Sequence, residues 1–207
     1  MDIILKYFPD LAESQKACFG MMFDLYYDWN SKINVISRKD IGNLYLHHVL
    51  HSLAISKILK FKPQTSVVDV GTGGGFPAVP LAVLFPETRF CLVDSVGKKI
   101  KATAGIVNSL GLKNCVFVND RMENVKEKFE FAVSRAVMPL ADLIKVLRKN
   151  IAREQKNALP NGIICLKGGE LQHETAPFKN SATLYNISDF FEEEYFKTKK
   201  AVYLPIL

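Results

Sequence analysis

An aspartate and three glycines alternate along one short stretch that directly follows an apolar run. Residues 66–76 read S-V-V-D-V-G-T-G-G-G-F, with Asp69, Gly71, Gly73 and Gly75 at alternate positions. Glycine adopts positive φ without strain and lets a ligand approach the backbone closely. An apolar segment at 77–85 predicts a helix behind the glycines, and the first turn of a helix offers unpaired N–H groups. The stretch therefore predicts a strand, a tight turn and a helix, with a ligand bound at the turn.

The spacing of these glycines discriminates between nucleoside ligands. A dinucleotide fingerprint requires G-x-G-x-x-G, and Phe76 stands where the third glycine would be, so a nicotinamide-dependent dehydrogenase is the least favoured interpretation. The pattern D-x-G-x-G-x-G is instead similar to that of S-adenosylmethionine-dependent methyltransferases. Asp94 ends the next predicted strand, about 20 residues after Gly71, where a carboxylate accepts hydrogen bonds from ribose hydroxyls. The plainer alternative is a glycine turn with a solvated aspartate nearby.

Side chains at the ends of the next two predicted strands could complete such a site, because ligands bind beyond the carboxyl ends of an open parallel sheet. Met122 and Glu123 follow the third strand. Met122 either packs on an adenine ring or fills the core. Arg135 interrupts the apolar strand end A-V-S-R-A-V and is either solvated or a clamp for a carboxylate or phosphate. We favour the clamp and predict that Arg135 is the catalytic residue.

The end of the fourth predicted strand also lacks one motif. Exocyclic-amine methyltransferases carry Asn/Asp-Pro-Pro-Tyr/Phe there, whereas this chain has S-R-A-V at 134–137. Methyl transfer from a sulfonium is an in-line displacement that depends on positioning, and it needs a base only when the nucleophile carries a proton. The absence favours an acceptor that needs no deprotonation, such as N7 of guanine, without identifying it.

Alternating strand and helix patterns predict an α/β fold with a mostly parallel, Rossmann-like, seven-stranded sheet and helices on both faces. The expected strands are 66–71, 88–93, 115–119, 129–135, 162–167, 182–187 and 200–205, and the expected helices are 77–85, 97–110, 139–153 and 169–174. The last two strands lack a long helix between them and could form an antiparallel hairpin. Residues 1–60 predict an N-terminal helical extension packed on a methyltransferase domain at 61–207, with helices over 11–29 and 41–59.

Composition and sequence patterns predict where in the cell the chain is located and whether it binds a metal. With 48% hydrophobic residues, no long apolar run and no signal-peptide pattern, the chain is expected in the cytoplasm and not in a membrane. The four cysteines form no metal-binding pattern and are expected to be reduced and buried. His47, His48 and His51 could include a metal-binding pair, but no third ligand is evident, so we expect helix-surface or interface histidines and no metal.

The net charge of +6 suits a polyanionic partner. Basic residues occur in several groups: Lys98, Lys99 and Lys101 at the start of one predicted helix, Arg148, Lys149 and Arg153 in another, and Arg38 and Lys39 in the N-terminal part. We take Arg38, Lys98 and Lys99 as candidate RNA contacts. No protein partner is evident, and we expect a monomer.

Beyond these patterns, the chain resembles the bacterial 16S rRNA guanine-N7 methyltransferases of the RsmG type, also called glucose-inhibited division protein B. The resemblance rests on nine segments in order: W-N-S-K-I-N-V-I-S (29–37), H-H-V-L-H-S-L (47–53), D-V-G-T-G-G-G-F-P (69–77), L-A-V-L-F-P (81–86), L-V-D-S-V-G-K-K (92–99), L-G-L-K-N (110–114), D-R-M-E (120–123), V-S-R-A (133–136) and L-K-G (166–168). Ala102-Thr103 departs from a common Phe-Leu of the family, a change we expect to affect packing more than chemistry.

The resemblance implies a class I methyltransferase fold and methyl transfer from S-adenosyl-L-methionine to N7 of one guanine in 16S rRNA of the small ribosomal subunit. It implies that Gly71 and Phe76 contact the cofactor, that Met122 and Glu123 flank its adenine, and that Arg135 lies in the cofactor and catalytic pocket. Two alternatives stay open: a methyltransferase for a protein or small molecule, and a non-catalytic rRNA-binding assembly factor that retains a cofactor-shaped pocket. A pocket blocked by Phe76 or Met122 would favour the assembly factor.

Overall fold

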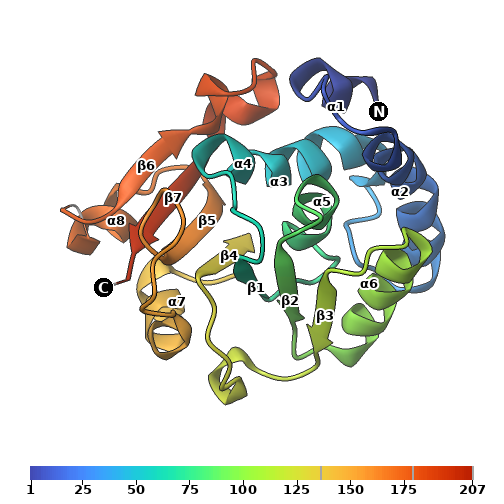
Figure 1. Ribbon diagram of the computed structural model, residues 1–207. Coiled ribbons are helices and arrows are strands. Elements are labelled where there is room, and N and C mark those ends of the chain that lie inside the picture. The colour runs from blue at the N-terminus through green and yellow to red at the C-terminus, as the bar shows by residue number, and fades with distance from the viewer. Residues whose placement is uncertain (136, 179, 207) are drawn as a thin grey trace.

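The computed structural model describes residues 1–135, 137–178 and 180–206 and contains one seven-stranded sheet with the order β3-β2-β1-β4-β5-β7-β6 (Figure 1). The strands are β1 (Ser66–Val70), β2 (Arg89–Val93), β3 (Cys115–Val118), β4 (Phe131–Arg135), β5 (Gly162–Gly168), β6 (Thr183–Asn186) and β7 (Lys199–Pro205). Strands β1 to β5 are parallel, whereas β7 pairs antiparallel with both β5 and β6. The predicted fold class and the antiparallel pairing of the last two strands are confirmed.

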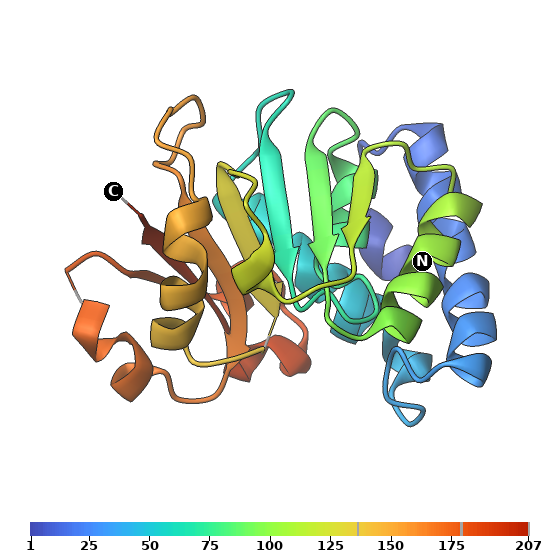
Figure 2. The same ribbon diagram turned by 90° about the horizontal axis from the view of Figure 1, so that it is seen from below.

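Alternate residues of the central strands enter two separate cores, one on each face of the sheet. Val67 of β1 and Val133 of β4 belong to the core that contains the N-terminal helices, α5 (Ala78–Leu84) and α6 (Gly97–Ser109). Val68 and Ala132 belong to the other core, which α7 (Leu140–Leu147) covers. Seen from below, α7 lies in front of the sheet (Figure 2). Because both faces are covered, the strands are near-continuous apolar runs.

The N-terminal helices pack directly on the first of these cores. They are α1 (Asp2–Tyr7), α2 (Glu13–Lys32), a 3₁₀ turn (Ile41–Asn43), a π-helix (Leu44–Leu50), α3 (His51–Leu53) and α4 (Ile55–Ile58). Phe19 and Tyr26 of α2 are fully buried together with Val67 and Phe131 of the sheet. The single helix expected over 41–59 is thus divided, and its π-helical part is a rare form that occurs frequently at functional sites.

Three further expectations are corrected. The helix predicted over 11–29 spans Glu13–Lys32, and α1 lies within the helical extension predicted over 1–60, for which no separate bounds were given. The helix predicted over 139–153 ends at Leu147, because Asn150 binds the carbonyls of Val125 and Glu127 and draws the chain into a 3₁₀ turn. Arg153 therefore lies outside a helix. Cys91 and Cys165 are buried as expected, but Cys18 and Cys115 are only half-buried.

Short helical segments connect the remaining strands. They are the 3₁₀ turns Met122–Asn124, Arg148–Asn150, Ala176–Phe178, Ile187–Asp189 and Glu194–Thr198, together with α8 (Gln172–Thr175). None of the described helices has the length and apolar character needed to cross a membrane. Over the same residues, no group of three or more His, Cys, Asp or Glu side chains is arranged to hold a metal ion.

Candidate active site

The glycine turn after β1 has the backbone geometry that its sequence predicts. Gly71, Gly73 and Gly75 have φ of +66°, +55° and +90°. A Cβ atom on Gly71 would also lie 2.8 Å from Cγ2 of Val137, in the segment that follows β4. A side chain at position 71 would therefore be strained in its backbone and would collide with the loop opposite.

Asp69 fixes both ends of this turn. Its Oδ2 accepts hydrogen bonds from the Thr72 hydroxyl (2.7 Å) and from the backbone N–H of Ala78 at the start of α5 (3.1 Å). The carboxyl is fully buried, which raises its pKa to about 7, and its Oδ1 has no hydrogen-bond partner among the described residues. The first acidic residue of the motif thus has a structural task that spacing alone does not reveal.

Two helices hold the glycine turn from outside. The Tyr26 hydroxyl of α2 donates to the Gly74 carbonyl (2.8 Å), and the Thr103 hydroxyl of α6 donates to the Gly73 carbonyl (2.9 Å). Sequence reasoning identified neither residue. Thr103 is one of the departures from the family pattern, and its contact shows that this position affects the site as well as the packing.

A cavity of about 350 Å³ lies beyond the carboxyl ends of β1 and β2. We call it the donor cavity, because it is the candidate site for the methyl donor that the sequence resemblance implies. Of the predicted residues, Gly71, Asp94, Met122 and Glu123 line it. Its other lining residues are Val70, Val93, Ser95, Asp120, Arg121, Val137, Met138 and Val146. Met122 is buried and Glu123 is exposed. The volume lies in the range of small-molecule sites, and the lining combines apolar walls with a few carboxylates.

Asp94 is oriented by the backbone. Its Oδ2 accepts from the Gly73 N–H (2.9 Å) and its Oδ1 from the Val96 N–H (2.8 Å), with 8% of the residue exposed. Gly73 is therefore placed to position Asp94 and does not itself line the cavity. Each carboxylate oxygen keeps a further lone pair, so the side chain can still accept hydrogen bonds from a ligand.

Arg135 and Phe76 lie together but outside the lining of the donor cavity. The guanidinium of Arg135 stands over the Phe76 ring, 5.0 Å from its centroid. Its Nη1 donates to the His47 carbonyl (3.2 Å) and its Nη2 lies 2.9 Å from Nδ1 of His48. Burial lowers the pKa of Arg135, but an arginine stays charged at neutral pH. We call Arg135, Phe76, His47, His48 and Asp40 the arginine cage.

The candidate RNA contacts lie at the edge of the sheet formed by the carboxyl ends of the parallel strands, which we call the catalytic edge because the candidate site residues lie there. Lys98 and Lys99 are in the first turn of α6, which begins at the carboxyl end of β2, and Lys98 is exposed. Arg38 is exposed two residues before Asp40 of the arginine cage. Arg148 follows the end of α7 and therefore lies at the opposite edge, near the start of β5.

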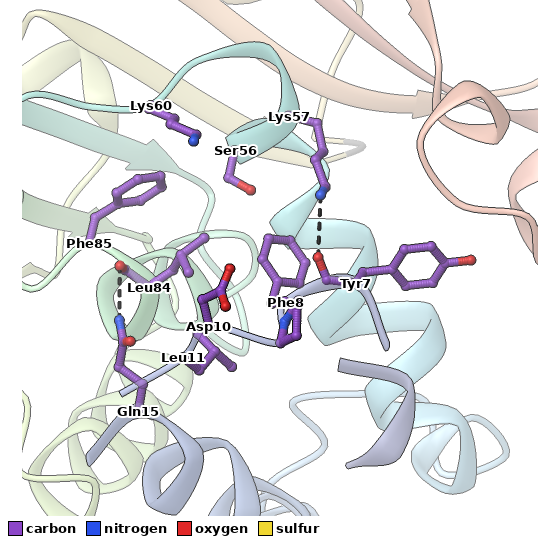
Figure 3. Close-up of a pocket in the computed structure, with 11 residues that line it drawn as sticks. Tyr7, Phe8, Asp10, Leu11, Gln15, Ser56, Lys57, Lys60, Leu84 and Phe85 are labelled. Carbon is purple, nitrogen blue, oxygen red and sulfur yellow. Dashed lines mark hydrogen bonds between the residues drawn. The ribbon is translucent and has the colours of Figure 1, made fainter. Parts of the chain in front are cut away.

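A second cavity of about 350 Å³ lies at that opposite edge, between the α1–α2 connection, α4 and the end of α5 (Figure 3). None of the predicted site residues lines it. Two of its polar side chains are engaged within the protein, since Lys57 donates to the Tyr7 carbonyl (3.4 Å) and Gln15 to the carbonyls of Val83 and Leu84. This cavity therefore holds none of the predicted site residues, four of which line the donor cavity at the carboxyl ends of the strands.

Solved structures share the fold of this chain. The chain is similar to an S-adenosylmethionine-dependent methyltransferase from Aquifex aeolicus, with a TM-score of 0.61 and 16% identity over 83% of this chain and 100% of that one. It is also similar to an rRNA methylase from Streptococcus thermophilus, with a TM-score of 0.52 and 16% identity over 76% and 95% of the two chains. The fold is that of the class I methyltransferases.

Sequence comparison then identifies the family. The family model described as rRNA small subunit methyltransferase G (GidB) matches residues 17–201. Proteins named ribosomal RNA small subunit methyltransferase G are 62% identical in Bacteroides thetaiotaomicron, over 100% of both chains, and 53% identical in Flavobacterium johnsoniae, over 100% of this chain and 98% of that one. The chain belongs to this family of methyltransferases, as the sequence resemblance indicated.

Proposed function

We propose that this protein transfers the methyl group of S-adenosyl-L-methionine to N7 of one guanine in 16S rRNA of the small ribosomal subunit. The observation that supports this most strongly is the donor cavity. It brings together Gly71, Asp94, Met122 and Glu123 at the switch point between β1 and β4, where open α/β sheets bind ligands. Family membership supports the ribosomal RNA substrate.

The residues of the donor cavity fit the cofactor. Gly71 lines the cavity with bare backbone at a positive φ, where a side chain would collide with Val137. Asp94 is oriented by two backbone N–H groups and can accept hydrogen bonds from ribose hydroxyls. Met122 offers an apolar, polarisable surface to an adenine ring, and Glu123 stands beside it at the rim. When bound, S-adenosylmethionine supplies an electrophilic methyl group on a sulfonium.

The end of β4 fits an acceptor that needs no deprotonation. The Ser134 hydroxyl donates to the Val70 carbonyl (3.1 Å), and Arg135 is a permanent cation, so neither side chain is suited to remove a proton. N7 of guanine attacks through its lone pair and has no proton to lose. Catalysis would then depend on positioning the base.

Arg135 is proposed as the residue that orients the acceptor. The resemblance implies that Arg135 lies in the cofactor and catalytic pocket. Its position outside the donor-cavity lining favours contact with the base over contact with the cofactor. Guanine presents O6 beside N7 as a second acceptor, and an arginine that donates to O6 would hold the base while N7 faces the methyl group. Of the five N–H groups of Arg135, three have no partner among the described residues.

The RNA is proposed to approach over the catalytic edge, where Arg38, Lys98 and Lys99 would neutralise phosphates. These three cations lie on the same edge as the donor cavity, whereas Arg148 does not. We also propose that residues 1–60 and 61–207 form one unit, since α2 contacts the glycine turn through Tyr26. We further propose that the protein is a monomer and works in the cytoplasm.

An assembly factor without catalysis is less well supported. A pocket blocked by Phe76 or Met122 would favour that alternative. Phe76 lies outside the cavity lining, and Met122 lines a cavity that is still about 350 Å³. A protein or small-molecule acceptor is less favoured because the three cations share the catalytic edge.

The test has two stages. Calorimetry with S-adenosylhomocysteine should show binding that Asp94→Asn weakens. Tritium transfer from labelled S-adenosylmethionine should then label small subunits purified from a strain that lacks the gene, with the label in the RNA fraction. Label in the ribosomal proteins, or cofactor binding without label, would overturn the proposed substrate.

A further inference from the structure

At the centre of the arginine cage, the Asp40 carboxylate makes hydrogen-bond contacts with two imidazole rings. Oδ1 of Asp40 lies 2.6 Å from Nδ1 of His47, and Oδ2 lies 2.8 Å from Nε2 of His48. The three side chains are 12–31% exposed, so these contacts are only partly screened by solvent. Asp40 precedes the 3₁₀ turn Ile41–Asn43, and both histidines belong to the π-helix.

The contacts of His48 fix its tautomer. An arginine N–H can only donate, so Nδ1 of His48, 2.9 Å from Nη2 of Arg135, must present its lone pair. The proton of the neutral ring then stands on Nε2 and is donated to Asp40. A single neutral tautomer satisfies both contacts, whereas an imidazolium would place N–H against N–H.

The charges around His48 favour this neutral form. Burial and the adjacent Arg135 lower the pKa of His48 to about 4, against the opposing influence of Asp40, and His47 on the same helix also lowers it. His48 is therefore neutral at physiological pH and is an acceptor for Arg135 throughout that range.

Other contacts close the cage. The His47 carbonyl accepts from Nη1 of Arg135, and the Phe76 ring lies under the guanidinium. The His47 ring stacks on Tyr195 with centroids 3.9 Å apart. The guanidinium plane is thus held by two hydrogen bonds and one ring face.

We propose that Asp40 and His48 are positioning residues that act in series, with Asp40 fixing the His48 tautomer and His48 fixing the plane of the Arg135 guanidinium toward the acceptor guanine. This inference rests on the proposed function for the role of Arg135. The series itself is a property of the free protein and can be tested without turnover.

The first test reads the tautomer directly. Nitrogen NMR of protein labelled at histidine should show one ring, assigned through its loss in His48→Asn, as the neutral Nε2–H tautomer with an unprotonated Nδ1 at pH 7. In Asp40→Ala the population of that tautomer should fall. An Nδ1–H tautomer or an imidazolium for His48 in the wild type would overturn the proposal, whatever the enzyme methylates.

The second test separates the two contacts of His48. In His48→Asn the amide oxygen can take the place of Nδ1 and still accept from Arg135, whereas in His48→Gln the amide group reaches the Nε2 position and the acceptor is lost. We expect His48→Gln to lower kcat about 10- to 100-fold with the KM for the cofactor nearly unchanged, and His48→Asn to retain most of the activity. Equal losses in both variants would contradict the series.

A comparison variant and a double-mutant cycle complete the design. The His47 ring also contacts Asp40, but His47 contacts Arg135 only through its backbone carbonyl, which a substitution retains. His47→Asn should therefore lower kcat less than His48→Gln does. In an Arg135→Lys background, which lacks the planar guanidinium, His48→Gln should lower kcat only a little further. Full additivity would show that His48 does not act through Arg135. An inactive wild type would instead count against the proposed function and leave the NMR result standing.

Discussion

The donor cavity and the arginine cage lie at the same sheet edge but are assembled in different ways. The donor cavity draws its polar residues from the ends of three consecutive strands, β1, β2 and β3. The arginine cage joins Arg135 at the end of β4 to Asp40 and two histidines that are 87 or more positions away in the chain. The donor cavity is built from the ends of strands that follow one another in the sequence, whereas the arginine cage forms only after the N-terminal segment packs on the sheet.

The difference implies separate tasks. A site made by strand ends and a glycine turn is shaped by backbone geometry, which suits a cofactor with fixed structure. A guanidinium held by neutral imidazole, a carbonyl and an aromatic ring is oriented by side chains from elsewhere, which suits a group that must meet a second substrate. Substitutions in the donor cavity should therefore weaken cofactor binding, whereas substitutions in the arginine cage should lower turnover.

Removal of the central cation should have the largest effect. Arg135→Ala should fold normally and bind S-adenosylhomocysteine within a few-fold of the wild type, but lose on the order of 100- to 1000-fold in kcat because the acceptor loses its oriented contact. Single-turnover methylation of small subunits measures this. Arg89→Ala, an exposed arginine at the start of β2, is the control. Retention of full turnover in Arg135→Ala would remove Arg135 from the site.

On the donor side, the strongest effect is expected from Gly71→Ala. The new Cβ would be forced to φ of +66° and into Val137, so cofactor affinity should fall on the order of 10- to 100-fold. Gly111→Ala is a matched control, because Gly111 has φ of +70° but nothing within 4 Å of the added atom. Calorimetry should show weakened binding only in the first variant. An unchanged affinity would place the cofactor elsewhere.

Asp94→Asn should act on the same side with a smaller effect. The amide can accept through one atom only, so it loses either a backbone N–H or a ribose hydroxyl, and affinity should fall about 10-fold with kcat at saturation little changed. Asp142→Asn, which affects only an exposed pair with Lys145, serves as the control. A loss confined to kcat would contradict the division of tasks.

Next to the arginine cage, His51 should determine part of the pH dependence of stability. Neither ring nitrogen has a hydrogen-bond partner among the described residues, and burial lowers the pKa of His51 to about 3. The unfolded chain therefore binds a proton between pH 6.5 and 3 that the folded chain does not, so the free energy of unfolding falls as the pH falls through this window. His51→Leu should flatten that decline and add about 1–2 kcal/mol at pH 7.

Urea unfolding at several pH values measures the effect, with exposed His173→Leu as the control. Buried Asp69 acts in the opposite sense, because its raised pKa makes the folded chain retain a proton up to about pH 7. An unaltered slope in His51→Leu would show that His51 is not buried as a neutral ring.

The smallest effect is expected where α2 supports the glycine turn. Tyr26→Phe removes one hydrogen bond to the Gly74 carbonyl and should weaken cofactor binding about 3- to 5-fold. Tyr45→Phe removes a comparable bond to the Phe19 carbonyl, remote from the turn, and should lower stability without changing affinity. Similar affinities in the two variants would mean that α2 does not position the donor cavity.

Sequence reasoning found one region far better than the other. The strands, the glycine turn, Asp94 and Met122 follow from periodicity and spacing, because residues close in sequence meet at one sheet edge, whereas the order of the strands in the sheet was not predicted. Asp40 was missed because it meets His48 through a 3₁₀ turn and a π-helix that were not predicted, and because only tertiary packing brings His48 to Arg135. The histidine cluster was noticed, but α-helical spacing was assumed for a segment that forms a π-helix.

The most direct test of the central claim is borohydride–aniline cleavage of 16S rRNA after methylation of small subunits from the strain that lacks the gene. This chemistry cleaves RNA at 7-methylguanine. We expect a single new cleavage site that depends on enzyme and cofactor and disappears with Arg135→Ala. Methyl label in the RNA without any cleavage would contradict the assignment of N7 as the acceptor.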